Sequence, residues 1–286
     1  MSDVPRTVAL TAVTLCAFAG NSLLCRLALA PPAAPASIDA LSFTALRIAS
    51  GAAVLLLLTR PWRAASGARW SPRSALALAA YAVCFSLAYV TLPAGVGALL
   101  LFGAVQVTML GAARLAGERL SAAQMVGLVA AIAGFVVLVA PGLSAPDPGG
   151  AALMLAAGVG WGLYSLFGRG LRKPAAANAC NFALATPLVA LAFLAQAGAA
   201  HADPRGAALA LVSGTLTSGL GYVAWYAALR GLTATSASIV QLAVPILAAF
   251  GGVLFLDERP TLRLALASVL TLGGVALATV RCRARE

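Results

Sequence analysis

Charged side chains are scarce in this sequence of 286 residues. Only 9% of them are Asp, Glu, Lys or Arg, whereas 62% are hydrophobic and the mean hydropathy is +0.96. Soluble domains carry about a quarter charged residues, so too few polar side chains remain here to cover a globule in water. We therefore expect lipid to surround most of the surface, which excludes an ordinary soluble fold.

Acidic and histidine side chains are absent from the centres of the apolar runs. The eight acidic residues and the single histidine, His201, all fall in tails, loops or the ends of these runs. Proton relays, general acids or bases and metal ligands in membrane proteins are usually built from such groups. A membrane-embedded enzyme and direct proton coupling are therefore disfavoured, facilitated diffusion or exchange fits better, and we expect no metal and no cofactor.

Paired cysteines and long basic tracts are also missing. The five cysteines are scattered without a CxxC pattern, which indicates small packing residues rather than a metal site or a disulfide framework. The net charge of +11 comes from short basic clusters between apolar runs, where they act as topology signals. We predict the lipid bilayer and a small-molecule substrate as partners, with no nucleic acid. The oligomeric state stays open, a monomer being one possibility.

What the sequence does contain is ten apolar runs of about the 20 residues that a membrane helix needs. Proline and glycine separate them; Pro93, Gly95 and Gly97 divide the longest uncharged stretch into two helices with a tight turn. The predicted spans are 7–29, 38–59, 73–91, 95–115, 121–140, 149–169, 176–198, 206–229, 234–256 and 262–280.

The basic residues predict the orientation of these spans. All but five of the 19 lie on the side of the N-terminus; Arg26 and Arg47 fall within spans, and Arg205, Arg259 and Arg263 lie on the opposite side. Cytoplasmic loops carry an excess of Lys and Arg. We therefore predict a multi-pass protein of the bacterial inner membrane with both termini in the cytoplasm.

The chain also repeats itself at an offset of 140 residues. Phe85 matches Trp225, and Glu118-Arg119 matches Glu258-Arg259. Ten spans then give five per copy, and an odd number inserts the copies in opposite directions. The predicted fold is an all-α integral membrane protein with ten transmembrane helices in two inverted five-helix repeats, residues 1–141 and 142–286. Inverted repeats recur in secondary transporters.

Several short motifs follow one another in a familiar order: Ala-Gly-Asn-Ser at 19–22 with its counterpart Trp-Gly-Leu-Tyr-Ser at 161–165, Arg47 early in the second run, Gly-Glu-Arg-Leu-Ser at 117–121, and Gln-Leu-Ala-Val-Pro at 241–245 before Leu-Asp-Glu-Arg at 256–259. Over almost the whole chain this order resembles the EamA-type members of the drug/metabolite transporter superfamily. The length and aromatic content resemble the amino-acid exporters of the YddG type. The halves differ, since Val105 stands opposite Pro245 and Ala19 opposite Trp161.

The resemblance implies transport of small metabolites, amino acids among them, in the outward direction. Two other classes stay open: a multispan enzyme acting on a lipid-linked substrate, and a receptor or scaffold without transport. An essential acid, histidine or metal inside the bundle would favour the enzyme, and the sequence offers none. Substrate flux in reconstituted vesicles would exclude the receptor or scaffold.

Candidate binding residues are the uncharged polar and aromatic side chains within the spans, because such groups need internal partners in lipid. Together they predict a cavity between the halves that is suited to neutral or zwitterionic molecules. Transport would then occur by alternating access. Packing and interhelical hydrogen bonds are the alternative roles. The predicted residues are Asn21, Tyr81, Phe85, Gln106, Trp161, Tyr164, Ser165, Tyr222, Trp225 and Gln241.

Three further positions in the spans carry predictions. Pro245 should remove one helix hydrogen bond and kink its helix beside Gln241, which makes it the predicted hinge. For Arg47 we expect a structural role, either facing Asp39 two turns away or snorkelling to the interface. Arg26 is likewise expected to snorkel, and attraction of a substrate carboxylate is the alternative for both arginines.

Overall fold

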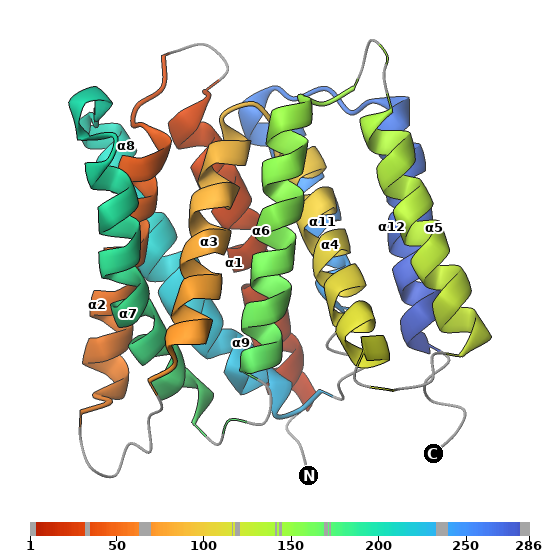
Figure 1. The fold of residues 1–286 in the computed structure, drawn as a ribbon, viewed down its shortest axis with the longest axis horizontal. Coiled ribbons are helices and arrows are strands. Elements are labelled where there is room, and N and C mark those ends of the chain that lie inside the picture. The colour runs from red at the N-terminus through yellow and green to blue at the C-terminus, as the bar shows by residue number, and fades with distance from the viewer. Residues whose placement is uncertain are drawn as a thin grey trace.

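The computed structural model describes residues 4–31, 35–62, 70–115, 117, 121–140, 142, 145–168, 171, 173–232 and 240–280. Within these residues the fold is helical throughout (Figure 1). The long elements are α1 (Val4–Leu29), α2 (Ala40–Thr59), α3 (Pro72–Tyr89), α4 (Ala94–Leu115), α5 (Ala122–Val139), α6 (Pro148–Phe167), α7 (Pro174–Leu194), α8 (Pro204–Val212), η3 (Ser213–Leu220), α9 (Gly221–Leu229), α11 (Ala243–Leu256) and α12 (Leu262–Val280), with a short 3-10 turn, η2 (Ala197–Ala199).

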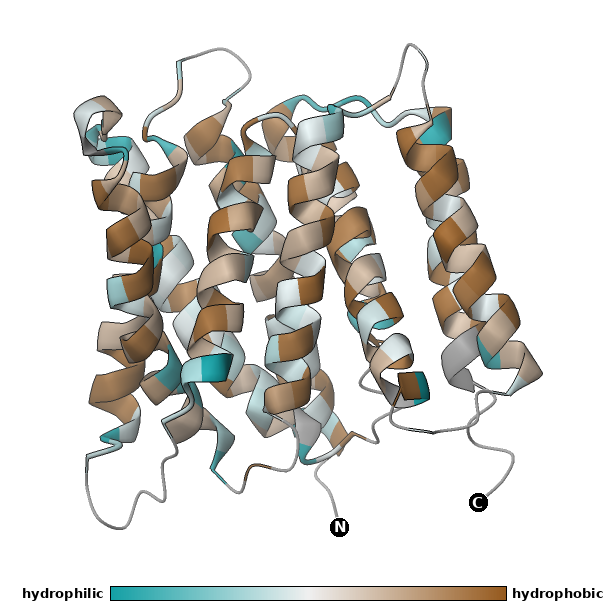
Figure 2. Cartoon of the chain, viewed as in Figure 1, coloured by the Kyte–Doolittle hydropathy of each residue, from teal (hydrophilic) through white to brown (hydrophobic). Residues whose placement is uncertain are grey.

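The helices have the length and surface of membrane spans. Seven of them, counting α8, η3 and α9 as one, are long and apolar enough to cross a bilayer, and α11 and α12 are shorter apolar helices. Hydrophobic residues predominate along the helices, while many of the hydrophilic ones lie toward the helix ends (Figure 2). Val129 and Phe250, for example, are more than 60% exposed. The chain is therefore an all-α, multi-pass membrane protein, as predicted.

Most helix boundaries lie within a few residues of the predicted spans. The eighth span differs internally, because its middle third, η3, is a π-helix in which backbone bonds run from i to i+5. The ninth span differs at its start. Residues 233–239 lie outside the described part, Gln241 is helical, Leu242 is a turn residue, and α11 begins at Ala243.

The position of Pro245 corrects one expectation. It lies in the first turn of α11 rather than in mid-helix. A proline cannot donate to the carbonyl four residues earlier, here that of Gln241, and its ring crowds that carbonyl. The helix is interrupted at Leu242, which lies between Gln241 and Pro245, where this hydrogen bond is missing. Whether the interruption bends during transport stays a prediction.

Small residues bring α6 close to α4, as the spacing of Gly158 and Gly162 predicts. A Cβ atom added to Gly162 would lie 2.9 Å from the Cβ of Thr108, and one added to Gly158 would lie 2.8 Å from the carbonyl oxygen of Leu101. Neither position can hold a larger side chain without moving a helix. The two helices that border the functional site are therefore fixed at short range.

Helices that are far apart in the sequence pack against each other in pairs. Close pairs include α3 with α6, α4 with α6, α1 with α9, α1 with α11, α2 with α7, α2 with η3, α4 with α11 and α5 with α12. The first residues of α1 and the last residues of α12 lie at the same end of the bundle (Figure 1). This arrangement agrees with an even number of crossings.

An ion pair links three elements at the opposite end. The Nε atom of Arg26 lies 3.4 Å from Oε1 of Glu258, and both side chains are less than 20% exposed. Arg26 also donates to the backbone carbonyls of Tyr89 and Val90, and Glu258 accepts from the backbone N–H of Ala94. Arg26 thus has a specific partner, and Glu258 caps the start of α4. The counterpart at Glu118-Arg119 lies outside the described residues.

Candidate functional site

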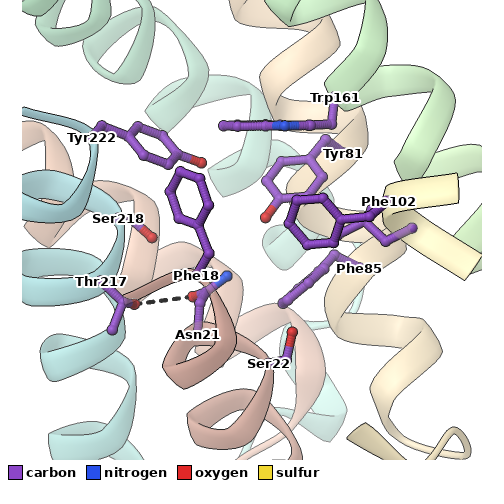
Figure 3. A pocket seen from close by; sticks show the side chains of 11 residues that line it. Phe18, Asn21, Ser22, Tyr81, Phe85, Phe102, Trp161, Thr217, Ser218 and Tyr222 are labelled. Carbon is purple, nitrogen blue, oxygen red and sulfur yellow. Dashed lines mark hydrogen bonds between the residues drawn. The ribbon is translucent and has the colours of Figure 1, made fainter. Parts of the chain in front are cut away.

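A small cavity lies inside the bundle between α1, α3, α4, α6, η3 and α9 (Figure 3). Its volume is about 20 Å³, which is enough for about one water molecule. An amino acid would need more room than this cavity offers. The lining residues are Phe18, Asn21, Ser22, Tyr81, Phe85, Leu101, Phe102, Trp161, Thr217, Ser218 and Tyr222.

Aromatic rings form most of the wall. Phe18 contacts the rings of Phe102, Trp161 and Tyr222, with centroids 5.9–6.5 Å apart. Trp161 also lies 5.0 Å from Tyr81 and 5.1 Å from Tyr222. These tilted and edge-on contacts join α1, α3, α4, α6 and α9 around one point (Figure 3). The rings provide flat, apolar surfaces to which water cannot hydrogen-bond.

The remaining wall is polar and joins α1 to η3. The side-chain carbonyl of Asn21 accepts hydrogen bonds from the hydroxyls of Ser213, at 2.7 Å, and Thr217, at 3.2 Å. Ser22 and Ser218 add two more hydroxyls to the lining. An uncharged amide and hydroxyls in a bundle core can hydrogen-bond polar parts of a ligand without the cost of burying a charge.

Arg47 of α2 lies directly behind this wall. It is 1% exposed; its Nε donates to the hydroxyl of Ser218 at 3.1 Å and its Nη2 donates to the hydroxyl of Tyr81 at 3.0 Å. The guanidinium carbon is 4.9 Å from the ring centroid of Phe85, a cation–π distance. Three cavity residues therefore hold the arginine in place.

Close backbone packing explains how η3 reaches Arg47. A Cβ atom on Gly214 would overlap the Ser50 hydroxyl and the carbonyl oxygen of Arg47, and one on Gly51 would lie 2.8 Å from the Phe182 ring. Only glycine allows α2 and η3 to approach this closely. Ser218, four residues after Gly214, is then within hydrogen-bond reach of the guanidinium.

The expected pairing of Arg47 with Asp39 is wrong. Asp39 is the N-cap of α2, where its carboxylate accepts from the backbone N–H groups of Leu41 and Ser42 and from that of His201. Helix N-termini attract such carboxylates because their first N–H groups have no intrahelical partner. Snorkelling is also excluded for Arg47, since its head group is buried among cavity residues.

Five of the ten predicted binding residues line the cavity: Asn21, Tyr81, Phe85, Trp161 and Tyr222. They come from α1, α3, α6 and α9, which the structure brings together although they are up to about 200 residues apart in sequence. Their assignment as substrate-binding residues stays a prediction, now with a shared cavity as its geometric basis.

The other five lie outside the lining. Trp225 stacks edge-on against Phe18 at 5.9 Å, the Tyr164 hydroxyl donates to the side-chain carbonyl of Asn178, and the Ser165 hydroxyl donates to the carbonyl of Trp161. The two glutamines, Gln106 in α4 and Gln241 before α11, also do not line the cavity.

Six residues that line the cavity were not predicted from the sequence: Phe18, Ser22, Leu101, Phe102, Thr217 and Ser218. Helical spacing could have found some of them. Phe18 lies three residues before Asn21 and shares its helix face, Ser22 lies four residues after Phe18, and Ser218 precedes Tyr222 by one turn. Leu101 carries no such signal.

A wall of this kind can bind a small neutral or zwitterionic molecule but offers no general acid or base. Among the described residues, no carboxylate, histidine or cysteine lines the cavity. Hydrogen-bonding groups on one side and aromatic faces on the other would orient a molecule with a polar end and an apolar end. The geometry therefore favours binding over bond-breaking chemistry.

Comparisons with known proteins agree with this picture. A model of the EamA-like transporter family matches residues 148–280. The chain is 54% identical over 275 residues to an uncharacterized protein of Pseudomonas aeruginosa, covering 95% of this chain and 94% of that protein. It is 30% identical over 264 residues to the threonine/homoserine exporter RhtA of Escherichia coli (strain K12), covering 85% of this chain and 84% of the exporter.

Two further matches extend the comparison. The chain is 30% identical over 216 residues to a probable terminal-alkyne amino-acid exporter of Streptantibioticus cattleyicolor, covering 74% of this chain and 73% of that protein. A crystal structure with 23% identity shares the fold, with a TM-score of 0.64 over 97% of this chain and 98% of its own. This chain therefore belongs to the EamA-like transporter family and is a membrane transporter rather than an enzyme.

Proposed function

We propose that this transporter exports small neutral or zwitterionic amino acids, including aromatic ones, by alternating access. The observation that carries the proposal is the cavity, which places amide and hydroxyl groups opposite aromatic faces inside the bundle. Such a wall matches a molecule with a compact polar end and an uncharged side chain. Two relatives are named as exporters, one of threonine and homoserine and one of terminal-alkyne amino acids, which supports the substrate class and the outward direction.

The pairing of helices supports an inverted repeat of residues 1–141 and 142–286. Exchanging each helix for its counterpart five spans away converts α3–α6 into the contact of α1 with the eighth span, and α4–α6 into α1–α11. The pairs α2–α7, α4–α11 and α5–α12 convert into themselves, and all of these contacts occur. Halves with equivalent contacts can exchange conformations, so the cavity between them would open to each side in turn.

The distribution of basic residues supports cytoplasmic termini and an inner-membrane location. Arg6, Arg60, Arg73, Arg114 and Arg230 all lie at the end of the bundle where α1 begins. This bias is the positive-inside signal. Export then means movement from that end toward the end at which Arg26 pairs with Glu258.

Facilitated diffusion or exchange is the coupling that the cavity supports best. A titrating carboxylate or histidine at the site is the usual basis of proton coupling, and the described lining holds neither. Counterflow in proteoliposomes tests the substrate class, and net uptake with and without a pH gradient tests this coupling. Vesicles preloaded with unlabelled L-threonine, L-homoserine or L-phenylalanine should accumulate the labelled amino acid without a pH gradient.

Counterflow also tests the cavity as the binding site. Trp161→Ala should raise the half-saturation concentration by about tenfold or more, because the central aromatic wall is lost. Trp62→Ala is the matched control, since Trp62 is 64% exposed and its removal should leave exchange unchanged. Absence of counterflow for every amino acid in the wild type would overturn the proposed substrate class. Equal effects of the two tryptophan substitutions would overturn the location of the site.

A further inference from the structure

We propose that Arg47 binds the carboxylate of the transported amino acid and is the fixed positive charge of the cavity. The inference rests on the proposed function, because it presumes that amino acids are carried. It adds a binding group, a recognised chemical feature and an orientation for the substrate.

The hydrogen bonding of Arg47, which lies behind the cavity wall, is incomplete among the described residues. Nε and Nη2 donate to Ser218 and Tyr81, whereas Nη1 is buried and has no hydrogen-bond partner within the described part of the chain. Buried donors are nearly always satisfied, and an unsatisfied one calls for an explanation. A carboxylate oxygen of a bound substrate would complete the set.

The charge of Arg47 is also uncompensated. The ion pair found among the described residues joins Arg26 to Glu258, and Asp39 is held by backbone N–H groups at the start of α2. A buried charge without a partner is costly, and in membrane proteins such groups mark substrate pathways. A carboxylate arriving with the substrate would supply the missing negative charge.

The neighbours of Arg47 are suited to receive that carboxylate. A guanidinium presents its donors as a planar fork that matches a carboxylate. The hydroxyls of Tyr81 and Ser218 accept from the arginine, so each keeps its own hydrogen to donate to a ligand. Both residues line the cavity. They belong to α3 and η3, so a bound carboxylate would contact both halves of the chain.

The remaining wall predicts unequal recognition of the two charges of an amino acid. No acidic side chain among the described residues lines the cavity to pair with the ammonium group. The rings of Phe18, Trp161 and Tyr222 and the Asn21 carbonyl offer only cation–π and dipolar contacts. Removing the carboxylate from a substrate should therefore weaken binding more than removing the ammonium group.

Competition counterflow with the wild-type protein provides the first test. Proteoliposomes exchange labelled L-threonine against unlabelled L-threonine, L-threoninamide or N-acetyl-L-threonine. The amide lacks the carboxylate, and should compete at least about 30-fold more weakly than threonine, as expected when one partner of a buried charge pair is removed. The N-acetyl compound keeps the carboxylate, and should compete more strongly than the amide.

Variants assign this discrimination to Arg47. Arg47→Gln should abolish the preference for the acid over the amide, and Arg47→Lys should keep part of it, because a lysine retains the charge but not the fork. Arg26→Gln is the matched control; it removes the other arginine within the spans and should leave the preference unchanged. Size-exclusion chromatography in detergent shows which variants are folded, and the lysine variant serves where the glutamine variant is not.

The outcomes separate this inference from the proposed function. Equal competition by L-threonine and L-threoninamide, or an unchanged preference in folded Arg47→Gln or Arg47→Lys, would overturn the role of Arg47 and leave amino-acid exchange standing. Absence of exchange for every amino acid would overturn the proposed function and this inference with it.

Discussion

Two arginines, Arg26 of α1 and Arg47 of α2, have opposite surroundings. Arg26, near one end of the bundle, has an acidic partner in Glu258 and two backbone carbonyls, and about a fifth of its side chain is exposed. Arg47, inside the bundle, contacts two hydroxyls and two aromatic rings, without an acidic partner among the described residues. Compensation by the protein indicates a structural charge, and its absence at a cavity indicates a functional one.

Separating η3 from α2 should disturb the surroundings of Arg47 most severely. Gly214→Ala would force a Cβ into the Arg47 carbonyl, so we expect a loss of about 1–3 kcal/mol in the free energy of unfolding and a large loss of exchange. The measurement is thermal unfolding in detergent together with counterflow.

Gly20→Ala is the matched control for that substitution. A Cβ at Gly20 would lie 3.6 Å from the nearest atom, a methyl carbon of Thr217, which is an ordinary contact. Equal destabilisation by the two substitutions would show that the close approach of α2 and η3 does not fix the position of Arg47.

Removing the Tyr81 hydroxyl, which accepts a hydrogen bond from Arg47, should have the next largest effect. Tyr81→Phe leaves a second guanidinium nitrogen without its partner, which should cost about 1–3 kcal/mol of stability. Tyr89→Phe provides the comparison, two turns further along α3. The Tyr89 hydroxyl donates to the Ala94 carbonyl at 3.3 Å, a long bond between uncharged groups, so its loss should cost about 1 kcal/mol or less. A larger loss for Tyr89→Phe would contradict the assignment.

Replacing Arg26 should have a smaller effect on stability. Arg26→Gln removes the ion pair with Glu258, but both groups lie near the end of the bundle, where water can reach them. We expect a loss of about 1 kcal/mol and no change in the preference for carboxylates. Thermal unfolding of Arg26→Gln beside the folded Arg47 variants checks this order. A greater loss of stability in Arg26→Gln than in the Arg47 variants would contradict the assignment of Arg47 as the less compensated charge.

The smallest predicted effect is a pH dependence from Glu258. Burial raises the pKa of Glu258 above its ordinary 4.5, and hydrogen bonds from Ala94 and the charge of Arg26 offset only part of this shift. A raised acid pKa contributes stability that is present below about pH 4.5 and is lost as the pH rises through the folded-state pKa. The unfolding temperature of the wild type should therefore fall relative to that of Glu258→Gln as the pH increases.

Asp39 should not produce the same slope. Burial alone would raise its pKa, but hydrogen bonds from Ser42, His201 and Leu41 together lower the pKa below its ordinary 3.8. Its contribution to stability is present above that value and is lost only in more acidic solution. A pH slope that survives in Glu258→Gln above about pH 4.5 would count against the assignment to Glu258.

The sequence was sufficient for the helices because apolar runs of about 20 residues have few other uses. It was also informative for residues such as Asn21 and Trp161, since polar or amphipathic groups in lipid need internal partners. It was uninformative for the hydroxyl residues of η3. The single hydrogen of the Thr217 hydroxyl is shared between the Asn21 side-chain carbonyl and the carbonyl of Ser213 one turn earlier. Because a helix offers such an acceptor itself, a hydroxyl in a membrane helix reveals little about which way it faces.

Two other differences have local causes. Asp39 and Arg47 are eight residues apart, a spacing that favours one helix face, yet Asp39 is the N-cap and is turned toward the backbone N–H groups. Trp225 matches Phe85 at the 140-residue offset, but only Phe85 lines the cavity. The π-helical η3 precedes Trp225, whereas α3 is a regular α-helix, so equivalent positions need not face the same way.

The π-helix has a consequence for the stereochemistry of transport. One residue added to an α-helix turns every later side chain by about 100°, and π turns absorb such a change without ending the helix. The two halves can therefore keep equivalent helix contacts while presenting different side chains to the cavity. A cavity with exact two-fold symmetry would accept a molecule equally well in two opposite orientations. The wall of this cavity has no such symmetry, because Asn21, Ser22, Thr217 and Ser218 provide its polar part and most of the rest is aromatic.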